Sequence, residues 1–122
     1  MPKKGRNGHF RYKQVPQGIR FYLRNLEAFS FKTMLNNYLV DATSLNGMLT
    51  VGQRIVLWVN AEVCKKVTSL YNEDSDTITI TLTKAQALAI HSQISARNII
   101  AENTYDVVLL NNINTAIDKT IL

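Results

Sequence analysis

A run of five consecutive apolar residues, 55–59, constrains the fold of this chain more than any other stretch. It contains the only tryptophan, Trp58, and it follows Gly52 and precedes an asparagine. A short apolar run closed by turn-forming residues is typical of a strand buried on both faces, although periodicity alone does not separate such a strand from a buried helical segment. We therefore predict a central core strand over residues 53–60, with a bend at Gly52 after a short strand over residues 48–51.

Two further segments alternate in character with period two, as the residues of a half-buried strand do. The clearer one covers residues 77–83, and its inward side would consist of Ile78, Ile80 and Leu82. The other covers residues 19–24, where Ile19, Phe21 and Leu23 would face the core and Arg20, Tyr22 and Arg24 would face away from it. Both segments are predicted to be strands.

The remaining regular segments show helical spacing. Residues 26–40 are ambiguous between strand and helix, but one helical face would hold Phe31, Met34, Leu35, Tyr38 and Leu39, so we favour a helix over residues 30–39. A second helix is predicted over residues 61–71 with Asn60 as its N-cap. Thr83 and Gln86 have the spacing of a capping box, which predicts a helix to about residue 97. The last helix, over residues 104–119, would bury Val107, Leu110, Ile113 and Ile117.

The predicted fold class is α+β, a small and mostly antiparallel sheet with packed helices that ends in two C-terminal helices. Turns are expected over residues 41–47 and 72–76. A chain of 122 residues is the size of one domain. We place that domain at residues 18–122 and expect an extended basic N-terminal arm over residues 1–17.

The positive charge is concentrated in the first fifth of the chain. The net charge is +5, yet residues 25–122 contain seven basic and nine acidic residues and have a net charge of −2. Residues 1–24 contain the other seven basic residues and no acidic one, namely Lys3, Lys4, Arg6, Arg11, Lys13, Arg20 and Arg24. Such an asymmetry indicates that a polyanion or an acidic protein would be bound at this end.

Aromatic residues are interleaved with these cations. Lysine and arginine can contact phosphates, and aromatic rings can stack on unpaired bases. The rings that we predict for base stacking are Phe10, Tyr12 and Tyr22. The alternative is a solubilising tail whose aromatic residues pack onto the body of the protein.

No pattern in the sequence indicates an enzyme, a cofactor, a metal site or a small-molecule substrate. His91 has no partner that the sequence identifies, and the single cysteine, Cys64, lies on an apolar helical stripe. Asn72, Asp74 and Asp76 resemble the start of a calcium loop, but threonine occupies both the glycine and the closing glutamate positions. The longest apolar runs are far shorter than a membrane-spanning helix needs, so no membrane association is expected.

We therefore expect a non-enzymatic component of a large macromolecular assembly, in a virion or in the cytoplasm. The sequence contains 12 asparagine, 11 isoleucine and 8 lysine residues, whose codons are A/T-rich, and this favours a small accessory protein of a phage virion. Its partners would be other protein subunits, with nucleic acid contacted through residues 1–24. The alternative is a ribosomal or other DNA- or RNA-binding accessory protein that uses the same cations on phosphates.

Overall fold

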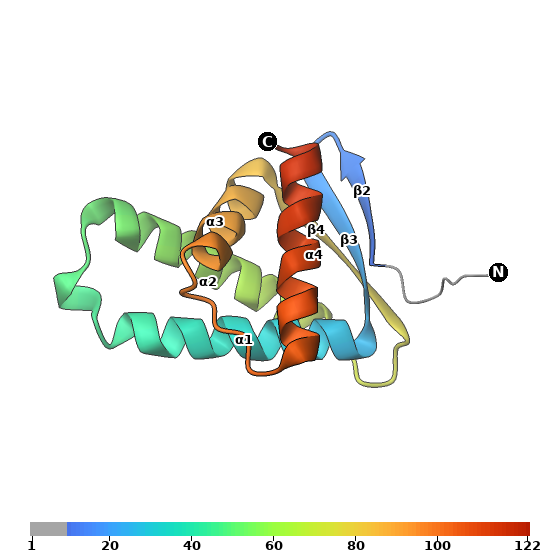
Figure 1. Ribbon diagram of the computed structural model, residues 1–122, viewed down its shortest axis with the longest axis horizontal. Helices are drawn as coiled ribbons and strands as arrows, with labels where there is room; N and C mark the ends of the chain where they lie inside the picture. The colour runs from blue at the N-terminus through green and yellow to red at the C-terminus, as the bar shows by residue number, and fades with distance from the viewer. Residues whose placement is uncertain (1–9) are drawn as a thin grey trace.

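The computed structural model describes residues 10–122. In this part of the chain, strands β2 and β3 are followed by a helical hairpin, a third strand and two further helices (Figure 1). The elements are β2 Arg11–Val15, β3 Gly18–Arg24, α1 Asn25–Thr43, a 3₁₀ turn Asn46–Met48, α2 Val51–Leu70, β4 Thr77–Thr83, α3 Lys84–Ser95 and α4 Thr104–Thr120. The predicted α+β class is confirmed.

The three strands form an antiparallel sheet in the order β2-β3-β4. One face of β3 and β4 is fully buried, as the alternation predicted, through Ile19, Phe21, Leu23, Ile78, Ile80 and Leu82. Helices α1, α3 and α4 pack on this face, and α2 packs against β4 (Figure 1). The opposite face carries the alternate residues of the strands, which are exposed or half-buried apart from Val15 and Gly18.

The prediction of a core strand over residues 53–60 is wrong. These residues belong to α2, which begins after Thr50, and Trp58 is 64% exposed. The Thr50 hydroxyl accepts a hydrogen bond from the Gln53 backbone amide, and the Gln53 side chain accepts one from the Thr50 amide. This capping box starts the helix, so the predicted strand over residues 48–51 is wrong as well.

Several helix predictions need correction in detail. The segment 26–40 is helical, as favoured, but α1 is longer at both ends and includes residues 41–43 of the predicted turn. Asn60 is not an N-cap: it is buried in the middle of α2, where its side-chain amide donates to the carbonyl of Val56. In α4, Leu109 rather than Val107 joins the buried stripe, and Val107 is exposed.

The predicted N-terminal arm overlaps the sheet. Arg11–Val15 is strand β2, and it pairs with β3 through a two-residue turn at Pro16 and Gln17. Residues 11–15 of the predicted arm therefore pair with the sheet. Residues 1–9 of the predicted arm lie outside the described residues.

A cavity of about 530 Å³ lies between the α1–α2 hairpin and the end of α3. Its lining includes the largely buried Tyr38, together with Leu57 and Ser92. Burial raises the pKa of the Tyr38 phenol above its ordinary value because the phenolate would lose hydration. The neutral phenol is thus the form that the fold favours.

We expect Tyr38→Phe to reduce the alkaline destabilisation of the protein. A raised pKa in the folded state contributes stability that is complete below the ordinary tyrosine pKa and is lost as the pH rises through the folded-state pKa. The free energy of unfolding of the Tyr38→Phe variant should therefore fall less than that of the wild type between about pH 8 and about pH 11. Urea unfolding at both pH values measures this difference. At pH 8 the difference between the two free energies of unfolding reports only the loss of the hydroxyl group. If the free energy of unfolding fell equally in both proteins between the two pH values, the prediction would be contradicted.

Candidate nucleic-acid interface

The register of the sheet gathers the predicted cations of β2 and β3 on one face. Arg11 pairs with Tyr22, which pairs with Thr79, and Lys13 pairs with Arg20, which pairs with Thr81. Paired residues in an antiparallel sheet point to the same side. We call this side the basic face, and it comprises Arg11, Lys13, Arg20, Tyr22, Arg24, Thr77, Thr79, Thr81 and Thr83.

The basic face holds cations on β2 and β3 and hydroxyl groups on β4. The three strands contain no aspartate or glutamate, so no acidic side chain of the sheet opposes these cations. Arg11, Lys13 and Arg24 are exposed, and Arg20 and Tyr22 are half-buried. Neighbouring strands lie roughly 4.8 Å apart and alternate residues along a strand roughly 6.7 Å apart, so the charges form one compact patch.

Two of the cations are held by neighbours on the same face. The Arg20 Nε donates to the Thr81 hydroxyl over 3.1 Å. The Arg11 guanidinium lies 5.1 Å from the centre of the Tyr22 ring, within the range of a cation–π contact. Both contacts order long side chains without neutralising their charge, so the cations stay available for an anion.

Arg24 differs because a carboxylate is its partner. Its backbone amide donates to Glu27 Oε1 over 2.8 Å, and its Nη2 donates to Glu27 Oε2 over 3.2 Å. The hydrogen bond to Glu27 raises the pKa of the Arg24 guanidinium. Glu27 is only 4% exposed, so Arg24 serves mainly to compensate a buried charge at the start of α1. Among the four cations of the basic face, Arg24 is therefore the weakest candidate for contact with a ligand.

The aromatic residues predicted for base stacking are divided between the two faces. Phe10 and Tyr12 lie on the helix-covered side, where both rings are partly buried against the core. The centres of the Phe10 and Phe21 rings are 5.5 Å apart. Tyr22 lies on the basic face, because it pairs with Arg11. The structure thus brings Tyr22 together with Arg11, Lys13 and Arg20 and separates Phe10 and Tyr12 from them. Lys3, Lys4 and Arg6 lie outside the described residues.

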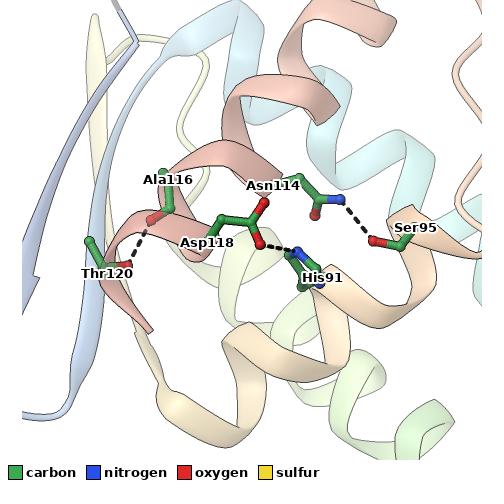
Figure 2. A network of polar contacts seen from close by, with 6 residues as sticks. All are labelled: His91, Ser95, Asn114, Ala116, Asp118 and Thr120. Atoms are coloured by element: carbon green, nitrogen blue, oxygen red, sulfur yellow. Dashed lines mark hydrogen bonds and ion pairs between the residues drawn. The ribbon is translucent and has the colours of Figure 1, made fainter. Parts of the chain in front are cut away.

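His91 has a partner that the sequence did not identify. Its Nε2 lies 2.7 Å from Asp118 Oδ1, and the contact joins α3 to α4 (Figure 2). One turn along, the Asn114 amide donates to the Ser95 hydroxyl over 3.1 Å between the same two helices. The two contacts hold α3 and α4 together. The lining of the 530 Å³ cavity does not include His91.

The other residues considered for catalysis or metal binding have structural roles. Cys64 is buried in α2. The Asn72 side chain accepts from the Asp74 amide over 2.9 Å, which closes the turn between α2 and β4. Within residues 10–122, no group of three histidine, cysteine, aspartate or glutamate residues is arranged to hold a metal ion. The helices of this part of the chain are all too short or too polar to cross a bilayer.

Comparison with known proteins adds no relative from which a role could be transferred. No family model, no curated protein and no solved structure matches this chain.

Proposed function

We propose that this protein binds nucleic acid through the basic face, as a non-enzymatic component of a large assembly. The observation that carries the proposal is the convergence of Arg11, Lys13 and Arg20 on an open sheet face whose strands contain no acid. Cations that replace the counterions of phosphates supply most of the affinity in binding that is independent of base sequence. An acidic protein partner is less favoured because the face also carries an aromatic ring and a row of hydroxyl groups.

The assembly that we propose is a phage virion, in which the protein would contact packaged nucleic acid and neighbouring subunits. The abundance of asparagine, isoleucine and lysine, whose codons are A/T-rich, supports this origin. Contact with other subunits is supported by an exposed apolar stripe on α2, where Val51, Ile55 and Trp58 follow one another at helical spacing. Exposed apolar surface of this kind is typical of protein contacts.

The double variant Arg11→Gln/Lys13→Gln tests the proposal. Wild-type affinity for DNA or RNA should fall linearly with salt on logarithmic axes, since each phosphate contact releases counterions. Loss of two contacts should weaken binding at low salt. The plot of log affinity against log salt concentration should also become shallower by about 1.4 to 1.8, which is about 0.7 to 0.9 for each contact. Fluorescence anisotropy of a labelled oligonucleotide at several salt concentrations measures both quantities.

The matched control neutralises two exposed cations outside the sheet, Lys65 on α2 and Arg97 after α3. The Lys65→Gln/Arg97→Gln variant has the same net charge as the test variant and should retain both the affinity and the slope of the wild type. If the two variants weaken binding equally, the net charge and not the basic face is responsible. A wild-type protein that binds no nucleic acid at low salt would refute the proposed function.

A further inference from the structure

We infer that the ligand of the basic face is a single strand, bound by stacking of an unpaired base at Tyr22 and by phosphate contacts from Arg11, Lys13 and Arg20. This inference rests on the proposed function and specifies the form of nucleic acid. It depends on the shape of the face, on the placement of the ring and on the distribution of hydroxyl groups across the strands.

The shape of the sheet does not suit a duplex groove. The major groove of B-DNA is about 12 Å wide and admits a helix or a two-stranded ribbon. The β2–β3 ribbon cannot enter it alone, because β4 pairs with the other edge of β3 and helices α1 and α4 pack on the covered face. A three-stranded face instead presents a broad platform on which an extended strand can lie.

The charge is also too compact to follow both backbones of a duplex. Arg11 and Lys13 are alternate residues of one strand, and Arg20 lies across from Lys13 on the next strand. With the strand spacings given above, the three cations lie within about 10 Å of one another. A patch of this size contacts adjacent phosphates of one backbone, whereas a duplex would direct its second backbone over β4, where only threonine side chains face outward.

A stacking role for Tyr22 requires unpaired bases. Its ring lies in the middle strand, with the Arg11 guanidinium 5.1 Å from the ring centre. Aromatic rings and arginine planes are both surfaces on which unstacked bases stack, whereas the bases of a duplex offer their faces only at its ends. The ring is thus placed to receive a base from a strand whose phosphates lie on the neighbouring cations.

The threonine row completes the platform on the side away from the charge. Thr79 pairs with Tyr22 and Thr81 pairs with Arg20, so the two threonines lie beside these residues on the basic face. Threonine hydroxyls commonly donate to sugar and phosphate oxygens, and such contacts position a strand without reading its sequence. We therefore expect binding that tolerates any base at Tyr22.

The test compares labelled oligonucleotides of about 12 nucleotides, a length within the range of site sizes for single-strand binding folds. The probes are oligo(dT), oligo(U), a mixed-sequence DNA strand and the duplex of that strand with its complement. The full-length protein should bind each single strand about tenfold or more tightly than the duplex at equal salt. The relative affinities of oligo(dT) and oligo(U) then show whether DNA or RNA is preferred.

Substitution at Tyr22 tests the stacking contact. Tyr22→Thr keeps a residue suited to a strand and should weaken single-strand binding about 5- to 150-fold without changing the salt slope. Tyr22→Phe retains the ring and should restore affinity to within about twofold of the wild type. Phe29→Ala, which removes an exposed ring from α1, serves as the control and should bind normally.

The outcomes separate this inference from the proposed function. Equal binding of single strand and duplex, with Tyr22→Thr unchanged, would overturn the inference and leave the proposed function in place. Failure of every probe to bind would refute the proposed function itself. A shallower salt slope in Tyr22→Thr would show that the variant disturbs the cations, and would count against a stacking role.

Discussion

Replacing Gly18 by alanine is expected to lower the free energy of unfolding by about 3 kcal/mol or more. Gly18 begins β3 with a φ of +158°, a backbone conformation that residues with a Cβ atom rarely adopt. An added Cβ would lie 2.3 Å from the Leu82 carbonyl oxygen and 2.9 Å from the Lys84 amide nitrogen. These are backbone atoms of the next strand and helix, so a side chain cannot move aside to relieve the clash.

The control for Gly18→Ala is Gly52→Ala in the first turn of α2. Apart from its chain neighbours and the backbone of its own helix, no heavy atom lies within 4 Å of a Cβ added at Gly52. Alanine is favoured over glycine in helices, so this variant should gain about 0.5 to 1 kcal/mol. Chemical denaturation of the two variants beside the wild type measures both changes. A Gly18→Ala variant as stable as the wild type would show that β3 and β4 can separate at little cost.

Phe31→Ala is expected to cost about 3 to 5 kcal/mol, the usual range for truncating a fully buried phenylalanine. Phe31 is 0% exposed on the inner face of α1, where it belongs to the core cluster together with Phe21 and Ile113. Truncation would remove apolar contacts and leave a cavity that close-packed neighbours fill only in part. The effect is a large share of the roughly 5 to 15 kcal/mol that stabilises a typical domain.

Trp58→Ala is the informative comparison for Phe31→Ala. The two residues are aromatic and lie on adjacent helices, but Trp58 is mostly exposed. Its truncation should change the free energy of unfolding by no more than about 0.5 kcal/mol, as surface substitutions usually do. Thermal or urea unfolding distinguishes the two variants clearly. A Trp58→Ala variant that loses as much stability as Phe31→Ala would contradict the exposed position of this ring.

Strands with regular alternation could be predicted from the sequence. β3 and β4 have one apolar face each, and their buried residues were identified correctly because period two fixes which side chains share a face. The capping box of Thr83 and Gln86 also located the start of α3. In these segments local preference and tertiary packing favour the same structure.

The apolar run in α2 misled the interpretation because neighbouring apolar residues fit both a buried strand and a helix exposed on one side. A signal that would have found the helix was present. Thr50 and Gln53 have the same capping-box spacing as Thr83 and Gln86. Helical spacing of Leu57, Cys64 and Val67 on the buried side is consistent with that start.

The basic face could be predicted in composition but not in arrangement. β2 contains few apolar residues, so its alternation of charged and other residues was assigned to an arm and not to an edge strand. Only pairing with β3 decides that Arg11 shares a face with Tyr22 and that Tyr12 shares a face with Phe21. The His91–Asp118 contact was missed for a similar reason, because the packing of α3 on α4 joins residues 27 positions apart.

The two margins of the sheet differ in how they would respond to another copy of the chain. Along β4, α2 packs beside the strand, and the Lys66 ammonium donates to the Thr81 carbonyl over 2.7 Å. Within residues 10–122 no strand pairs with the outer margin of β2, so a second β2 could approach there, but Arg11 and Lys13 of both copies would then repel each other. The residues proposed to attract a polyanion therefore also oppose fibril-like stacking of the protein on itself. High ionic strength weakens both effects together.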